Sequence, residues 1–165
     1  MCLKVNPNIT IKDLKKKTDA NGLIKVWKVL RVNKFNVTSP LYRHTWKLGW
    51  NYSSRIDARF TLEEKRWNEI ERGIHVFLNR ESARRYKKRE FSLSSMLKDL
   101  IIVPLYVKKE DFVAGAKDRY TRIGQGLKEA VFVKACLKTE DYRKAIKSAN
   151  NPGGNRTIIR RKKTT

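Results

Sequence analysis

Four basic residues recur along one side of a predicted helix that runs from Asn79 to Glu90. Their spacings are i, i+4, i+7 and i+8, at Arg80, Arg84, Lys87 and Lys88. Residues at these spacings share one helix face, and Arg85 and Arg89 flank them. An ordinary solvated face mixes both signs of charge, and this is the alternative, but the acidic residues here stand only at the helix ends. We interpret the helix as a rail for phosphate groups.

A second segment, residues 41–59, mixes aromatic and basic side chains without a clear period. Its candidate nucleic-acid contacts are Tyr42, Arg43, Trp46, Lys47, Trp50 and Arg55. Aromatic rings among basic chains suit base stacking beside phosphate contacts, as on single-stranded nucleic acid. The alternative is that the large rings pack inside the protein, because tryptophan is usually mostly buried. We expect at least two of the four tryptophans to be structural, among Trp27, Trp46, Trp50 and Trp67.

The end of the chain is basic and carries no acidic residue. After Asn150-Asn151-Pro152-Gly153-Gly154 come the candidate phosphate contacts Arg156, Arg160, Arg161, Lys162 and Lys163. Such a run predicts a disordered arm that follows a nucleic-acid backbone without reading its sequence, or a nuclear-localisation-like signal. A tail that only confers solubility is the alternative.

His75 is the histidine whose context is most suggestive of chemistry. It follows a glycine turn, in Gly73-Ile74-His75-Val76-Phe77, where a histidine can be catalytic, bind a ligand or simply complete the core. His44 lies among basic residues and is interpreted as a surface contact. Cys2 becomes an N-terminal nucleophile only if Met1 is removed, and no base stands near it. We find no Cys/His cluster and no phosphate-binding loop, so we expect no metal and no cofactor.

The charge of the chain names a class of partner. Lys and Arg number 39 against 16 Asp and Glu, which leaves +23 over 165 residues. Self-repulsion of this size is best neutralised by a polyanion, and RNA and DNA are the common intracellular ones. The hydrophobic share of 40% argues against a disordered basic protein. The longest apolar stretch, Leu100–Val107, is far short of the roughly 20 residues of a membrane span. We therefore expect an intracellular protein without a membrane partner.

The elements that must position these residues mix helices and strands without regular alternation. The predicted helices cover residues 10–19, 61–73 and 79–90, with one turn at Glu110 stopped by Gly115 and a last helix from Thr139. The predicted strands cover residues 23–33, 74–78, 100–107 and 130–137, with a bulge or a sheet edge at Pro104. A loop is expected over 116–128. This pattern predicts one α+β domain, residues 1–149, with a mixed or antiparallel sheet, several short helices and a disordered tail over 150–165.

One pattern carries a resemblance to known proteins. The chain resembles small uncharacterised proteins of phages, large DNA viruses and bacteria through Ile70-Glu71-Arg72-Gly73-Ile74-His75-Val76-Phe77, then Ala83 and Tyr86, then two apolar strands. More distantly it is similar to the ADP-ribosyltransferase-like fold, in which a catalytic glutamate opens a later strand. The resemblance implies Glu129 as that glutamate, near Gln125. It further implies Arg31 or His75 as the nicotinamide partner, NAD as cofactor, and a viral or mobile-element origin.

Three functions follow as hypotheses. The leading one is a nucleic-acid-binding protein without a cofactor, which binds largely without sequence specificity through phosphate contacts, with RNA or single-stranded DNA favoured. The second is an NAD-dependent enzyme with Glu129 and His75 facing a pocket between two sheets. The third is an interaction protein that docks on an acidic protein or inhibits a host nucleic-acid enzyme. Copurification with protein that survives nuclease treatment would favour the third over the first.

Overall fold

The computed structural model describes residues 3–5, 8–15, 17–32, 37–40, 45–53, 69–70, 73–91, 99–118 and 129–150. The basic residues of the tail, most of the helix predicted at 61–73 and the loop at 119–128 lie outside these ranges. Seven residues singled out above also lie outside them: Cys2, Tyr42, Arg43, His44, Arg55, Trp67 and Gln125. Everything stated below about the structure refers to the described residues.

The described strands form one sheet in which every paired neighbour is antiparallel. They are β1 (Leu3–Val5), β2 (Leu23–Val32), β3 (Val37–Thr38), β4 (Thr45–Trp46), β5 (Gly49–Tyr52), β6 (Glu69–Ile70), β7 (Ile74–Phe77), β8 (Leu100–Lys108), β9 (Phe112–Asp118), β10 (Glu129–Phe132) and β11 (Lys134–Leu137). The main order is β5-β11-β8-β2-β7-β10-β9-β1-β6. Within the described residues three α-helices accompany the sheet, α1 (Ile11–Lys15), α2 (Arg80–Phe91) and α3 (Thr139–Asn150), together with one 3-10 turn, η2 (Lys109–Asp111). The predicted antiparallel sheet is confirmed, with fewer helices than expected.

The centre of the sheet closes on itself. β10 and β11 are separated by Val133 alone, yet β10 pairs with β7 while β11 pairs with β8. β8 and β7 both pair with β2. The series of neighbouring strands β11, β8, β2, β7 and β10 therefore begins and ends on one continuous segment of chain. Alternate residues of these strands point inward and form the main core, which includes Ile24, Val26, Leu30, Val76, Val103, Leu105, Phe132 and Leu137.

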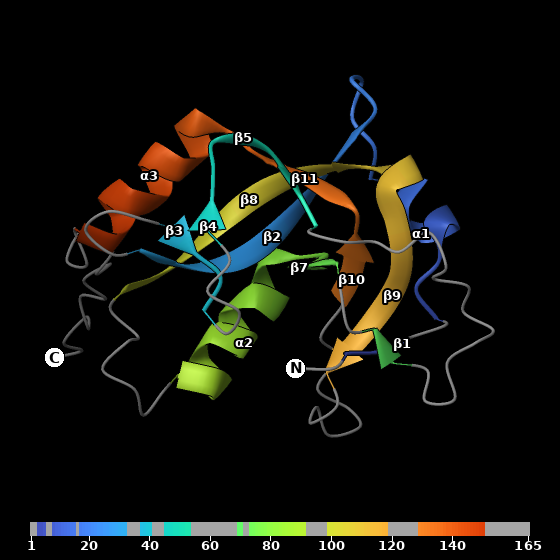
Figure 1. The fold of residues 1–165 in the computed structure, drawn as a ribbon, viewed down its shortest axis with the longest axis horizontal. Coiled ribbons are helices and arrows are strands. Elements are labelled where there is room, and N and C mark those ends of the chain that lie inside the picture. Colours follow the sequence, from blue (N-terminus) through green and yellow to red (C-terminus); the bar gives the residue numbers. More distant parts are fainter. Residues whose placement is uncertain are drawn as a thin grey trace, which may run out of the picture.

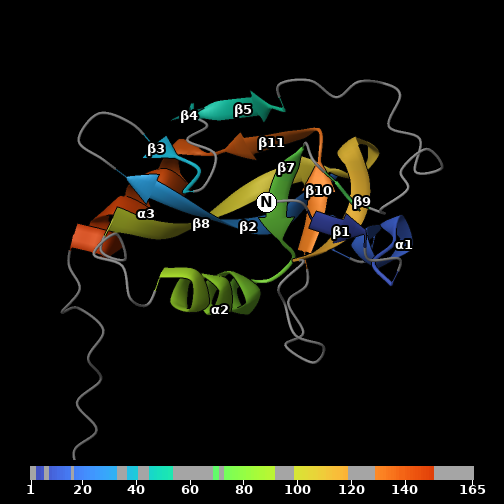
Figure 2. The same ribbon diagram turned by 60° about the horizontal axis from the view of Figure 1, so that its bottom comes forward.

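Helices cover the ends and one outer side of this closed sheet. α3 packs Tyr142, Ala145 and Ile146 against the main core and α1 adds Leu14, and Figure 1 shows the two helices at opposite ends of the sheet. α2 lies on the outer side over a smaller core of Val29, Phe77, Ala83, Tyr86 and Leu100. Figure 2 shows α2 on one side of the sheet and β5 on the other. None of the helices in the described residues covers the outer side near β5.

Strong periodicity located most elements correctly. β2, β7, β8, α2 and α3 match their predicted ranges to within one or two residues. Asn79 caps α2 as expected, since its side-chain oxygen accepts a hydrogen bond from the Ser82 amide. Ala145 and Ile146 are confirmed as core contacts of the last helix.

Three local predictions are wrong. Glu69–Ile70 is strand β6 rather than helix, because it pairs with β1. The helical turn predicted at Glu110 is present as η2 (Lys109–Asp111), but it ends well before Gly115. Gly115 lies inside β9, which pairs with β10 as far as Ala116 and with β1 as far as Asp118, so residues 116–118 are strand rather than loop. Pro104 lies opposite Trp27 in an unbroken register with β2, so no bulge occurs there; on its other side the described part of β11 pairs with β8 only at Tyr106, and the sheet edge at Pro104 stays a prediction. The predicted single strand at 130–137 bends at Val133, which shifts the inward-facing set from Ala130 and Phe132 to Ala135 and Leu137.

Candidate nucleic-acid interface

A row of side chains crosses four strands on the outer side of the sheet. Trp50 on β5 lies opposite Cys136 on β11, which lies opposite Tyr106 on β8, which lies opposite Lys25 on β2. Directly paired residues project from the same face of a sheet. One pair further along, Tyr52 lies opposite Lys134. We call this surface, with the adjacent Lys138, the outer aromatic face, and its members are Lys25, Trp50, Tyr52, Tyr106, Lys134, Cys136 and Lys138.

The turn before β5 determines that its aromatic rings point outward. Asn51 is buried opposite Ala135, and its side chain accepts a hydrogen bond from the Lys47 amide and donates to the carbonyl of Lys47. Because neighbours along a strand alternate between faces, Trp50 and Tyr52 face away from the core. They remain 38% and 57% exposed, although burial of rings this large is a major source of stability. Exposed aromatic side chains in adjacent same-face positions are a feature of binding surfaces.

Cationic side chains stand over the aromatic rings of this face. The Lys134 ammonium lies 5.5 Å from the centre of the Tyr52 ring, and the Lys138 ammonium lies 3.9 Å from that of Tyr106. On β2, the Trp27 ring is approached by Lys25 at 5.3 Å and by Arg80 at 5.5 Å. These pairs are cation–π contacts. They hold positive charge next to flat apolar surface, which is the combination that a base and its phosphate require.

Tyr106 is the most constrained ring of the face. Its hydroxyl donates a hydrogen bond to Asp141 at 3.0 Å. Burial, followed by the hydrogen bond and the negative charge of Asp141, raises the pKa of Tyr106 to about 12. Because Asp141 and the nearby Glu140 begin α3, phosphate is disfavoured at this end of the face. The Tyr52–Lys134 end, where Lys134 also lies 3.8 Å from Asp111, has the greater aromatic exposure.

The basic helix α2 is in place, but its cations differ in what they contact. Arg84 and Arg85 are exposed and pair with Glu81 at 3.9 and 3.2 Å. Lys88 is exposed, whereas Arg89 is half-buried and lies over the Tyr86 ring. Lys87 donates to the carbonyl of Leu100, and burial lowers its pKa. Lys87 therefore anchors α2 to β8, so it is unavailable as the phosphate contact that helical spacing predicts.

Two residues of the aromatic segment have opposite environments. Trp46 is only 6% exposed and its indole nitrogen donates to the Ser39 hydroxyl, so it is a core residue in this structure and its ring is closed to stacking. Lys47 is exposed beside β5. Trp27 is half-buried under α2. Trp27 and Trp46 are therefore structural, as expected of at least two tryptophans, whereas Trp50 is accessible. The sequence pattern did not predict that Tyr106 and Lys134 belong to the candidate interface. The alternation of Trp50 and Tyr52 is the sequence signal that could have indicated their strand.

The structure brings His75 and Glu129 together. The register of β7 and β10 makes them diagonal neighbours, with Phe77 opposite Glu129 and Val131 opposite His75. The His75 Nε2 atom lies 3.3 Å from Glu129 Oε2. Glu129 is fully buried, and neither its carboxylate oxygens nor Nε2 forms an aligned hydrogen bond with the described residues. A buried acidic group with so little compensation is uncommon.

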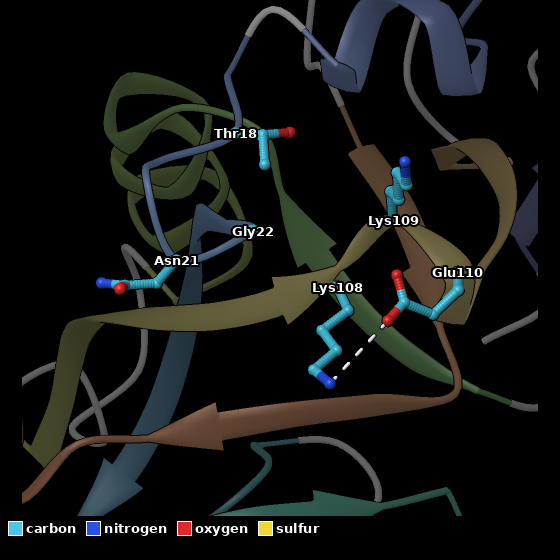
Figure 3. A pocket seen from close by; sticks show the side chains of 6 residues that line it. All are labelled: Thr18, Asn21, Gly22, Lys108, Lys109 and Glu110. Atoms are coloured by element: carbon cyan, nitrogen blue, oxygen red, sulfur yellow. Dashed lines mark ion pairs between the residues drawn. The ribbon is translucent and has the colours of Figure 1, made fainter.

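A shallow pocket lies elsewhere, between the turn before β2 and the end of β8. Thr18, Asn21, Gly22, Lys108, Lys109 and Glu110 line it. Figure 3 shows Lys108 directed at Glu110, with the Lys109 side chain directed away from that pair. Neither His75 nor Glu129 lines this pocket, so it is distinct from the site expected from the ADP-ribosyltransferase resemblance.

The described residues contain no group of three or more His, Cys, Asp or Glu side chains that could hold a metal ion. No helix in the described ranges is long and apolar enough to cross a membrane. Comparison with protein-family models, with curated proteins and with solved structures finds no match for this chain.

Proposed function

We propose that this protein binds single-stranded nucleic acid, RNA or DNA, on the outer aromatic face. The observation that carries the proposal is the exposure of Trp50 and Tyr52 on one strand, with Lys134 opposite Tyr52 and Lys25 at the far end of the row that starts at Trp50. The net charge of +23 supplies the general attraction for a polyanion.

The geometry favours single strands over duplexes for a physical reason. Aromatic rings on a sheet can stack only with bases that are not already stacked in a helix. Trp50 and Tyr52 are two residues apart on β5, so their Cα atoms are roughly 7 Å apart. Adjacent unpaired bases of an extended strand can therefore each meet one ring, with their phosphates next to Lys134 and Lys47.

The basic surface of α2 extends this interface rather than replacing it. Arg80 opens the helix and contacts the same Trp27 ring as Lys25, so the cations of α2 begin where those of the sheet end. Arg84 and Lys88 follow on exposed turns. We assign α2 a role in contacting the phosphates of a longer nucleic-acid chain, with little influence on which bases are bound.

Fluorescence anisotropy with a labelled single-stranded oligonucleotide tests the proposal. Stacking on one aromatic side chain is worth about 1–3 kcal/mol, so Trp50→Ala should weaken binding roughly 5- to 150-fold. Leu48→Ala is the matched control, because Leu48 is exposed just before the same strand but offers no ring. It should bind within about twofold of the parent protein.

Salt dependence separates stacking from charge. If roughly 6–10 phosphates are neutralised, affinity falls about 10³–10⁵-fold between 50 and 200 mM salt. Trp50→Ala should leave that slope unchanged while lowering affinity at each salt concentration. Equal effects of Trp50→Ala and Leu48→Ala, or an affinity that salt does not alter, would contradict the proposal.

A further inference from the structure

The His75–Glu129 pair lies on the outward-facing surface of the closed sheet, as the outer aromatic face does, next to the part of that surface that α2 covers. Phe77 lies opposite both Trp27 on β2 and Glu129 on β10, so these residues share a face. Lys134, beneath Tyr52, is five residues from Glu129 on the continuous β10–β11 segment. At about 3.3 Å per residue this separation is no more than roughly 17 Å. A single-stranded nucleic acid bound on the outer aromatic face can thus extend to His75.

Packing alone accounts poorly for a glutamate at position 129. The residue is fully buried, and in register it lies between Phe77 and Ala116, both buried and apolar. An apolar side chain would fill that space without the cost of desolvating a carboxylate. Among the described residues the ionisable side chain within reach is His75, whose Nε2 lies 3.3 Å from Glu129 Oε2. Buried acidic groups paired with a histidine are concentrated at functional sites.

The histidine of the pair keeps access to solvent. Its side chain is 20% exposed while the Nε2 atom facing Glu129 is buried, so the exposed part of the ring lies away from the carboxylate. A carboxylate on one nitrogen orients the imidazole and stabilises the cation that forms when the other side of the ring takes up a proton. The alignment is loose here, as is common for catalytic contacts in the absence of substrate.

We propose that His75, positioned by Glu129, cleaves single-stranded RNA by activating its 2′-hydroxyl. The inference rests on the proposed function, since the bound strand must be RNA. The imidazole removes the 2′-hydroxyl proton, the 2′-oxygen forms a bond to the adjacent phosphorus, and the bond from phosphorus to the 5′-oxygen breaks. The imidazolium returns its proton to the departing 5′-oxygen. The products are a 2′,3′-cyclic phosphate and a 5′-hydroxyl, and no other reactant is consumed.

RNA is the substrate class because it carries its own nucleophile. A single general base next to the 2′-hydroxyl is sufficient to start this reaction, and general-base catalysis contributes about 10²–10⁴-fold. DNA lacks the 2′-hydroxyl and should bind without being cleaved. In this scheme His75 is the catalytic residue and Glu129 is a positioning residue.

The test incubates the full-length protein with a labelled single-stranded RNA and with the same sequence carrying 2′-O-methyl groups, and follows both binding and cleavage. The parent protein should bind both, cleave only the RNA and leave cyclic-phosphate ends. His75→Gln should lower the cleavage rate at least 100-fold with affinity within about twofold. It also controls for contaminating nuclease, because it is purified identically.

Glu129 is tested by a pair of variants. Glu129→Gln should lower kcat at least tenfold with KM unchanged, and Glu129→Asp should restore part of kcat. A merely structural role would instead change thermal stability and RNA affinity together. RNA that is bound but not cleaved by the parent protein would overturn this inference and leave the proposed function intact. Absence of binding would overturn both.

Discussion

Replacement of the buried Lys28 should change the pH dependence of stability in a calculable way. Lys28 lies on the inward side of β2, where its ammonium donates to the His75 carbonyl at 2.6 Å and lies 5.5 Å from the Trp46 ring centre. No carboxylate of the described residues pairs with it. Burial lowers the pKa of Lys28 from 10.5 to about 8. Lys28→Met keeps an unbranched side chain of nearly the same length and removes the titrating group.

The magnitude follows from linkage. Between about pH 8 and 10.5 the unfolded protein holds a proton on Lys28 that the folded protein has released, so the folded state gains stability as pH rises. From pH 7 to pH 10 this gain is about 2–3 kcal/mol. Lys28→Met lacks it. The free energy of unfolding of the variant minus that of the parent should therefore fall by about 2–3 kcal/mol over this interval.

Urea denaturation of both proteins at pH 7 and pH 10, followed by tryptophan fluorescence, measures the difference. Titration of the other lysines and tyrosines is common to both proteins and cancels. Lys25→Met is the matched control for the loss of one lysine, because Lys25 lies on the same strand but is exposed. If the Lys28→Met difference is constant, the ammonium is not desolvated as described and the reasoning is refuted.

Two further predictions concern local geometry. Gly73 has φ of 118° and a Cβ there would overlap the Val131 side chain, so Gly73→Ala should destabilise the protein by at least about 2 kcal/mol. Gly22 has φ of 73° but open space around it, so the control variant Gly22→Ala should lower the free energy of unfolding by about 1 kcal/mol. Equal losses for the two variants in urea denaturation would contradict the overlap at Gly73. Tyr106→Phe should remove the ultraviolet transition expected near pH 12 and cost about 1 kcal/mol through loss of the Asp141 hydrogen bond, whereas an unchanged titration curve would contradict the assignment.

Sequence periodicity predicted the elements whose faces differ clearly in polarity. β2 alternates β-branched with basic residues and α2 begins at a capping asparagine, and both were located to within a residue or two. β5 was missed because its polarity is inverted: the aromatic residues Trp50 and Tyr52 face outward and the polar Asn51 is buried, so the alternation does not mark an apolar inner face. The bend at Val133 was missed because apolar residues continue through it on both faces of the chain.

The candidate site depended on register, which local patterns do not encode. Trp50, Cys136, Tyr106 and Lys25 are far apart in the chain and become a row only through the pairing of four strands. His75 and Glu129 were each named beforehand, one from its context and one from a resemblance. Their contact arises because β10 pairs with β7 in a register that places Phe77 opposite Glu129.

Protection of the Cys136 thiol by single-stranded nucleic acid tests the central claim most directly. Cys136 lies between Trp50 and Tyr106 and is partly exposed, and a Cys2→Ser background leaves it as the only thiol. Burial raises its pKa, so alkylation is followed at about pH 8.5 for detectable rates. A saturating oligonucleotide should slow alkylation at least tenfold in this background and much less when Trp50→Ala is added. An unchanged rate at saturation would show that nucleic acid does not bind on the outer aromatic face.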